Sequence, residues 1–251
     1  MKPIKPTIGP NIFDPQQGDQ PQVESWEELN SQIVACATCP RLVAYRQEVA
    51  RIKRRAFLDW EYWGRPVPGF GDRHARLLIV GLAPAAHGAN RTGRMFTGDS
   101  SGHTLIEALY RFGFANQPTS QHRNDGLELD DAFLTAVVRC VPPNNRPTRE
   151  ELNNCRVYLT RELLLLSSVQ VVLVLGHIAF DGYLALLREQ GVDLPRLAFH
   201  HGACYNFAPP LPTLVVSYHP SRQNTQTGRL SQGMLDAVLT QVTVALEMTV
   251  T

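Results

Sequence analysis

The feature that most constrains the fold is a set of short apolar runs separated by amphipathic stretches. Continuous, mostly β-branched or aliphatic runs of this length are typical of strands buried on both faces, and they begin at Leu77, Ala132, Val169 and Thr213. The stretches between and after them have helical periodicity near residues 102–112, 149–166, 177–190 and 231–247. Alternating strands and helices predict an α/β fold, in which a mainly parallel sheet is covered by helices on both sides.

The N-terminal part of the chain has a different pattern. Residues 1–22 contain five prolines and little that a core would bury, which is typical of a flexible arm. Two helices are expected next, at residues 25–34, where the sequence opens with a capping-box pattern, and at residues 41–54. The remaining chain, residues 23–251, is long enough for one large core, and we expect a single domain.

Length and composition also limit the cellular setting. No apolar run approaches the roughly 18 to 20 residues that a membrane-spanning helix needs, and the N-terminus lacks the apolar segment of a secretion signal. We therefore expect neither membrane insertion nor secretion. Disulfides are then a poor explanation for the five cysteines of the chain, and thiolate chemistry or metal binding becomes the better one.

Basic residues gather in one part of the sequence. The formal net charge is only +1, yet residues 41–76 contain more bases than acids, among them Arg46, Arg51, Lys53, Arg54, Arg55, Arg65 and Arg73. Binding to a polyanion needs a local basic face of this kind more than a basic protein as a whole. Charge alone favours the simpler interpretation, an ordinary solvated helix surface.

Four of the cysteines form a candidate metal site. Cys36 and Cys39 make a CxxC motif that is followed at once by proline, and Cys140 and Cys155 form a second pair separated by fourteen residues. Four thiolates suit either a structural zinc ion or an iron–sulfur cluster, and their spacing alone does not choose between them. A metal here would tie the N-terminal helices to the sheet. Cys204 is expected to be an ordinary buried side chain.

Unusual loops follow three of the predicted strands. Ligands of parallel sheets bind outside the carboxyl ends of the strands, so these loops are candidates for a site. Their sequences are GLAPAAHGANRTGRMFTGDSSG, RCVPPNNRPT and SYHPSRQNTQTGRL. The first is rich in glycine but contains neither GxxxxGK[ST] nor GxGxxG, so we expect no nucleotide cofactor. Asp99 in this loop can simply cap the next helix, and that role stays open beside a chemical one.

Together with the four cysteines, the loop sequences resemble the uracil-DNA glycosylase superfamily, and within it family 5, the type B enzymes of bacteria and archaea. The resemblance covers roughly residues 36–245. It implies a three-layer sandwich with a four-stranded, mainly parallel sheet, and a four-iron four-sulfur cluster on the cysteines, with structural zinc as the alternative. It also implies a monofunctional enzyme of base excision repair, which flips uracil out of DNA and leaves an abasic site.

The resemblance further implies a setting for this activity. The partner is DNA that contains uracil or another damaged base, and the place is the prokaryotic cytoplasm, at the nucleoid. We expect a monomer. Because the three loops contain no lysine, we expect no covalent lysine intermediate.

Roles for individual residues follow from the same resemblance. Asp99 matches the carboxylate near the reacting sugar, and His219 matches the histidine close to O2 of the base. Phe96 matches the aromatic side chain on which the flipped base stacks. The backbone on the other side of the predicted substrate pocket is that of Gly81, Leu82, Ala83 and Pro84.

Further matches concern the DNA and the identity of the base. Asn145 matches an asparagine that faces the abasic product. Ala136 stands where most other branches of the superfamily have an asparagine that reads the uracil edge; the same alanine is usual in family 5. Without that amide, discrimination is expected to fall and the range of bases to include hypoxanthine and other damaged bases. The residues expected to enter the DNA groove follow His219 directly: Ser221, Arg222, Gln223, Asn224 and Thr225.

Two other functions compete with this hypothesis. A redox protein would use the cysteine-bound cluster for electron transfer and would not need the Asp99 and His219 loops. A DNA-binding module with a zinc ion would keep its affinity for DNA but would not cleave any bond. Visible absorbance and an assay on uracil-containing DNA distinguish the three.

Overall fold

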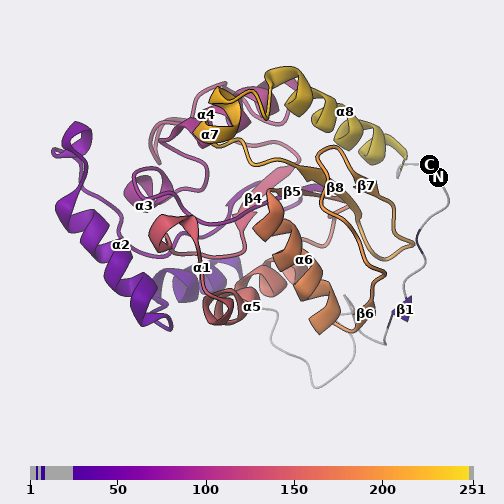
Figure 1. Ribbon diagram of the computed structural model, residues 1–251, viewed down its shortest axis with the longest axis horizontal. Helices are drawn as coiled ribbons and strands as arrows, with labels where there is room; N and C mark the ends of the chain where they lie inside the picture. The colour runs from indigo at the N-terminus through magenta and orange to yellow at the C-terminus, as the bar shows by residue number, and fades with distance from the viewer. Residues whose placement is uncertain (1–3, 5–6, 9–24, 249–251) are drawn as a thin grey trace.

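The computed structural model describes residues 4, 7–8 and 25–248, so most of the predicted arm at residues 1–22 lies outside the described residues (Figure 1). The described helices are α1 (Trp26–Ala35), α2 (Pro40–Ile52), η1 (Arg55–Phe57), α3 (Ala89–Thr92), α4 (Ser100–Arg111), η2 (Pro143–Asn145), α5 (Arg149–Leu165), α6 (His177–Glu189), α7 (Arg222–Gln226) and α8 (Gln232–Met248). The described strands are β1 (Thr7–Ile8), β2 (Phe70–Gly71), β3 (Leu77–Gly81), β4 (Ala132–Ala136), β5 (Val171–Leu175), β6 (Val192–Asp193), β7 (Cys204–Tyr205) and β8 (Thr213–Ser217).

The main sheet has the strand order β2-β4-β3-β5-β8-β7. The central strands β4, β3, β5 and β8 are parallel, and β2 and β7 pair antiparallel at the two edges. The predicted α/β fold is confirmed, but among the described residues this sheet has six strands instead of the four that the resemblance implies. The additional strands are two residues long, too short to leave an apolar run in the sequence. Separately, β1 pairs antiparallel with β6.

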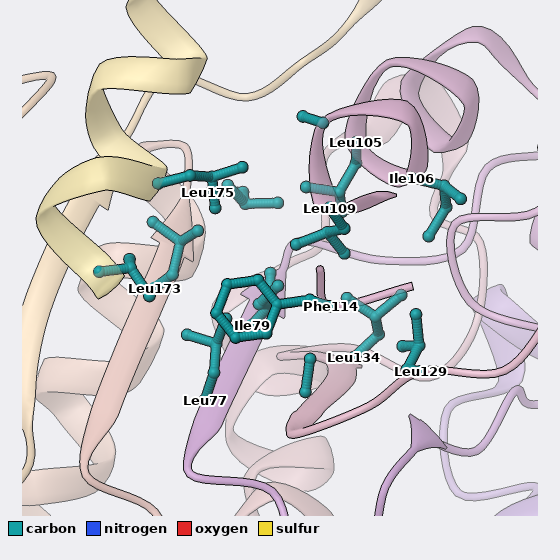
Figure 2. Close-up of a cluster of buried hydrophobic side chains, with 14 of the residues drawn as sticks. Leu77, Ile79, Leu105, Ile106, Leu109, Phe114, Leu129, Leu134, Leu173 and Leu175 are labelled. Atoms are coloured by element: carbon teal, nitrogen blue, oxygen red, sulfur yellow. The ribbon is translucent and has the colours of Figure 1, made fainter. Parts of the chain in front are cut away.

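Two cores lie on the two faces of the sheet because successive side chains of a strand point in opposite directions. Every residue of β3, β4 and β5 is buried, as the continuous apolar runs predict. Leu77 and Ile79 pack with α4 and α8, and Figure 2 shows part of this cluster. Leu78 and Val80 pack on the other face with α5 and α6. The helices therefore cover both faces, which gives the three predicted layers.

The longer helices begin and end within two residues of the predicted positions. The predicted capping box before α1 is present, with Ser25 Oγ accepting from Glu28 N at 3.1 Å, and Thr148 caps α5 in the same way. Of the helices in the described part of the chain, none has the length and apolar character needed to cross a membrane.

Candidate active site and metal centre

A pocket lies at the carboxyl ends of the parallel strands. It encloses about 350 Å³, part of which is open to solvent. The strand ends contribute its floor, because β3 ends at Gly81 and β4 at Ala136, and their registers place these two residues side by side. The loops after β3 and β8 supply its walls. The lining residues are Gly81, Ala83, Pro84, Ala85, Ala89, Met95, Phe96, Asp99, Ser101, Ala136 and His219.

Two rings form one wall of this pocket. The Phe96 and His219 rings are stacked, with centroids 6.3 Å apart and planes 28° from parallel. A Cβ at Gly81 would lie 2.7 Å from Phe96 Cζ, so only glycine lets the phenylalanine ring approach this closely. Phe96 also has φ of 50°, in the left-handed region that aromatic residues rarely adopt. Backbone of this kind is found mainly at functional sites, where the surrounding structure holds it.

Asp99 both caps a helix and lines the pocket. It is the N-cap of α4, and its Oδ1 accepts from Gly102 N at 2.9 Å. Burial raises the pKa of the Asp99 carboxyl, while the N–H groups of Gly102 and Ser101 and the charge of Arg91 act in the opposite direction. Gly88 lies directly against the carboxylate, since a Cβ there would overlap Asp99 Oδ2. The simple capping role and a place in the pocket thus belong to the same side chain.

His219 is held by its backbone while its ring lines the pocket. Its carbonyl accepts from Asn224 Nδ2 at 2.8 Å and from Ser221 N at 2.8 Å. The residue before it, Tyr218, is held as well, because Tyr218 N donates to Nδ1 of His201 at 3.1 Å. Burial lowers the pKa of His219 to about 4, so the imidazole is neutral at physiological pH. A neutral ring can donate one hydrogen bond to a pocket ligand.

Arg91 lies close enough to Asp99 for its charge to lower the pKa of that carboxyl. The sequence did not indicate Arg91 as a site residue. Arg91 is 3% exposed, and its guanidinium lies between the rings of Phe57 and Trp60, with Cζ 3.9 Å and 4.0 Å from their centroids. Nε donates to His87 O at 2.7 Å and Nη2 donates to Gly98 O at 2.8 Å. Arg91 therefore joins both ends of the loop segment that leads to Asp99. An arginine in a glycine-rich loop is a weak sequence signal, because its two aromatic neighbours are distant in sequence.

Several predicted residues lie outside this pocket lining. Leu82 packs against the core cluster on the α5 and α6 side. Asn145 is exposed on η2, with φ of 54°. In the predicted DNA-contacting segment, Arg222 and Gln223 are exposed on α7, whereas Thr225 Oγ1 donates to Ser221 O at 3.2 Å. Asn224 is engaged with His219, as described above. Two kinds of residue are therefore mixed in this segment: exposed side chains and side chains that hold the loop together.

The four cysteines predicted to bind a metal line a second pocket, which encloses about 330 Å³. Cys36 ends α1 and Cys39 begins α2, so the CxxC motif forms the junction of these helices. Cys140 follows β4 and Cys155 lies on α5. Burial raises the pKa of the Cys140 thiol to about 12 and that of Cys155 to about 11. A cation is needed to stabilise thiolates in such a place.

The surroundings of the sulfur atoms suit a negatively charged group. Arg46 Nη1 donates to Cys140 Sγ at 3.3 Å, and Arg139 N donates to Cys155 Sγ at 3.2 Å. Arg46 Nε and Arg139 Nε and Nη1 are buried without a hydrogen-bond partner. Four thiolates around a metal carry negative charge, toward which these partnerless guanidinium N–H groups can donate. The residues present therefore fit the implied group.

Within residues 25–248, no three Cys, His, Asp or Glu side chains are grouped closely enough to hold a single ion. The four cysteines nevertheless share one pocket.

Comparisons with known proteins agree with the fold. The family model described as Uracil DNA glycosylase superfamily matches residues 68–243. A type-5 uracil-DNA glycosylase of Mycobacterium leprae (strain TN) is 51% identical over 212 residues, which cover 84% of this chain and 91% of the relative. A type-5 uracil-DNA glycosylase of Thermus thermophilus is 51% identical over 210 residues, covering 82% and 92%. A type-4 uracil-DNA glycosylase of Pyrobaculum aerophilum is 34% identical over 164 residues, covering 64% and 74%. The chain therefore belongs to the uracil DNA glycosylase superfamily and, within it, to the type-5 group.

Proposed function

We propose that the protein is a DNA-repair glycosylase that excises uracil from DNA and leaves an intact abasic site. The observation that carries this proposal is the pocket at the carboxyl ends of the strands, where Phe96, Asp99 and His219 lie together. Two relatives that are 51% identical to this chain are named as type-5 uracil-DNA glycosylases. Their names support uracil in DNA as the substrate. The pocket lining contains no lysine, in agreement with hydrolysis without a covalent lysine intermediate.

Each side chain has a role in the proposed reaction. The base must leave the stack before its glycosidic bond can be reached, and Phe96 then offers a ring face for it. As the bond breaks, positive charge develops on the sugar and negative charge on the base. Asp99 faces the sugar cation; at about 4 Å and an effective dielectric near 20, this attraction contributes on the order of 4 kcal/mol, or roughly a thousandfold in rate. Positioning of a water by Asp99 is compatible with this role.

His219 acts on the leaving base in this proposal. Because the ring is neutral, it stabilises the developing negative charge at O2 by donating a hydrogen bond rather than by carrying a charge. Fixed donors in a pocket shielded from water are effective because they need no reorganisation during the reaction.

A uracil-excision assay tests the proposal. Duplex DNA with a single uracil is incubated with the wild-type protein, with Asp99→Asn and with His219→Gln, and abasic sites are revealed by alkaline strand scission. The wild type is expected to produce alkali-labile product, and each variant to be slower by roughly a hundredfold or more. Intact DNA with the wild type, or near-full activity in Asp99→Asn, contradicts the proposed mechanism.

The floor of the pocket bears on which bases the protein excises. Ala136 presents only a methyl group there, so no side-chain amide selects one base edge. We infer that hypoxanthine and other damaged bases are excised as well as uracil. Excision from uracil-, hypoxanthine- and ethenocytosine-containing duplexes is compared for the wild type and Ala136→Asn. The wild type should act on more than uracil, and Ala136→Asn should narrow the range; strict uracil specificity in the wild type contradicts the inference.

We also propose that Cys36, Cys39, Cys140 and Cys155 hold a four-iron four-sulfur cluster. When bound, the cluster supplies a rigid cross-link between the α1–α2 junction, the end of β4 and α5. The chemistry in the active-site pocket needs no change of oxidation state, so the residues of the two sites act separately. Iron and sulfide content and visible absorbance of the purified protein test the assignment. Zinc in a colourless protein contradicts it.

The proposed substrate defines the setting of the protein. Arg222 and Gln223 are exposed on α7 next to the His219 loop, which supports their contact with DNA. The predicted site of action is the prokaryotic cytoplasm, at the nucleoid. The expected monomer and the expected absence of a nucleotide cofactor stay predictions, to be checked by light scattering and by mass spectrometry of the native protein.

A further inference from the structure

The turn that follows α2 has a surface that the functions above do not use. Residues 51–60, named here the basic turn, contain four basic residues and a single acid, Asp59. Arg51, Arg54 and Arg55 are exposed, and the ion pairs described for residues 25–248 involve none of the three. Two large apolar side chains are also exposed on the basic turn: Ile52 is 57% exposed and Leu58 is 56% exposed.

The basic turn is fixed by its own hydrogen bonds. Lys53 Nζ donates to Leu58 O at 2.9 Å and closes the turn. Inside it, Phe57 N donates to Arg54 O at 2.7 Å, and the rings of Phe57 and Trp60 meet edge to face. A surface that is ordered before binding loses less conformational entropy when a partner arrives. The charged and apolar side chains of the basic turn are thus attached to a backbone that is already ordered before a partner binds.

Direct contacts join the basic turn to the loop that carries Asp99. Arg91 is enclosed between Phe57 and Trp60, as described above. Tyr62, just beyond the turn, is hydrogen-bonded to His87 Nδ1 at 3.1 Å, and its hydroxyl accepts from Arg54 N at 3.4 Å. The next residue after His87 is Gly88, which lies against Asp99. In Figure 1 the turn projects beyond the end of α2, at the end of the molecule where α3 lies.

We propose that the basic turn is a second DNA-contacting element, separate from α7. Arg51, Arg54 and Arg55 bind backbone phosphates near the flipped nucleotide, and Leu58 packs against the exposed bases or sugars of the duplex. Charge complementarity favours DNA: unpaired guanidinium groups beside an active-site loop attract phosphates, and an apolar tip among them suits a wedge at a base step. The inference rests on the proposed function, because DNA is the substrate assumed.

Salt dependence of binding tests the phosphate contacts. Affinity for a duplex with a stable abasic-site analogue is measured over a series of salt concentrations for the wild type and Arg54→Ala/Arg55→Ala. Each lost phosphate contact reduces the slope of log affinity against log salt by about 0.9, so the double variant should lose roughly 1.8. The matched control is Arg188→Ala/Arg196→Ala, in which both arginines are exposed, Arg188 at the far end of α6. The control should keep the wild-type slope.

Leu58→Ala tests the apolar contact. It should lower kcat/KM roughly tenfold on uracil in duplex DNA and leave kcat/KM on single-stranded DNA unchanged, because only a duplex needs a wedge. Leu164→Ala, which removes a similarly exposed leucine on α5, is the control and should behave as the wild type. Circular dichroism verifies that all variants fold.

The outcomes separate this inference from the proposed function. An unchanged salt slope in Arg54→Ala/Arg55→Ala, or an equal loss in the arginine control, overturns the phosphate contacts even if uracil is excised. Equal losses by Leu58→Ala on both kinds of DNA overturn the wedge. If the wild type excises no uracil but the double variant still loses its salt slope, the proposed function fails and the basic turn remains a DNA-binding element.

Discussion

At the scale of single residues, the position of the Asp99 carboxylate depends on the absence of a side chain at Gly88. Gly88→Ala places a methyl group where Asp99 Oδ2 lies, so the carboxylate must move. Because displacement of a catalytic group by about 1 Å can cost roughly a hundredfold in rate, we expect kcat to fall by that order. Steady-state kinetics on uracil-containing DNA measures the effect.

A second glycine gives the control for this substitution. A Cβ at Gly233, in α8, meets nothing within 4 Å, and this residue is not part of the pocket lining. Gly233→Ala should therefore keep full activity and gain up to about 1 kcal/mol of stability, since alanine favours a helix. Full activity in Gly88→Ala would mean that Asp99 does not need its present position.

The pH profile of kcat/KM reports on Asp99 and Arg91. The reaction needs ionised Asp99, whose pKa is raised by burial, so activity should fall with decreasing pH at a value above the ordinary aspartate pKa of about 3.9. Arg91 lowers the pKa of Asp99; in Arg91→Gln this acid limb should move to higher pH, whereas in Arg91→Lys, which keeps the charge, it should move less. His219, with a pKa of about 4, should add no transition near pH 6.5. An unshifted limb in Arg91→Gln contradicts the coupling.

At the scale of secondary-structure elements, a buried ion pair connects the segment that follows β4 to α5. Arg139 Nη2 donates to Glu162 Oε2 at 2.6 Å, Thr135 Oγ1 donates to the same oxygen at 2.6 Å, and Glu162 is fully buried. Glu162→Gln leaves the Arg139 charge uncompensated in the core, which typically costs about 3 to 5 kcal/mol. For a chain of this size, the midpoint of thermal unfolding should then fall by roughly 6 to 20 °C.

An exposed pair provides the comparison. Glu189, on α6, is 56% exposed in its side chain and pairs with Arg156 of α5. Such surface pairs contribute at most about 1 kcal/mol, so Glu189→Gln should change the midpoint by only a few degrees. Equal shifts in the two variants would contradict the importance of the buried pair.

The elements also indicate how much the sequence could predict. The four central strands and the longer helices were predicted because each leaves an apolar run, a helical period or a capping pattern. Strands β2 and β7 leave none, since a pair of residues has no period. Of the candidate site, the resemblance predicts Phe96, Asp99 and His219, and these three residues line one pocket. Arg91 could not be identified, because its aromatic neighbours are brought to it only by the folded chain.

At the scale of the whole molecule, the cysteine centre joins segments that are far apart in the sequence. Cys36 and Cys39 lie at the junction of α1 and α2, whereas Cys140 follows β4 and Cys155 lies on α5. Removal of the proposed cluster with a chelator under reducing conditions should therefore release α1 and α2 before the central sheet unfolds. Limited proteolysis should show the first new cuts between residues 25 and 64.

The same treatment should affect catalysis indirectly. The chain from Cys140 leads directly to η2, and Arg41, near the start of α2, donates to Arg146 O at 3.1 Å. Loss of the centre should weaken DNA binding near Asn145 more than it changes the active-site pocket. Cys204→Ser is the control, since Cys204 lies outside the cysteine pocket and should alter neither proteolysis nor metal content. Unchanged cleavage after metal loss would contradict the cross-linking role.

The edge strands of the main sheet affect how readily the protein aggregates in a concentrated solution. Each margin is closed by a two-residue antiparallel strand, β2 on one side and β7 on the other. A short edge strand offers a foreign chain too little open backbone to extend the sheet by addition of another strand. The long, strongly apolar strands, which would be the segments most prone to aggregation if exposed, are enclosed between these margins.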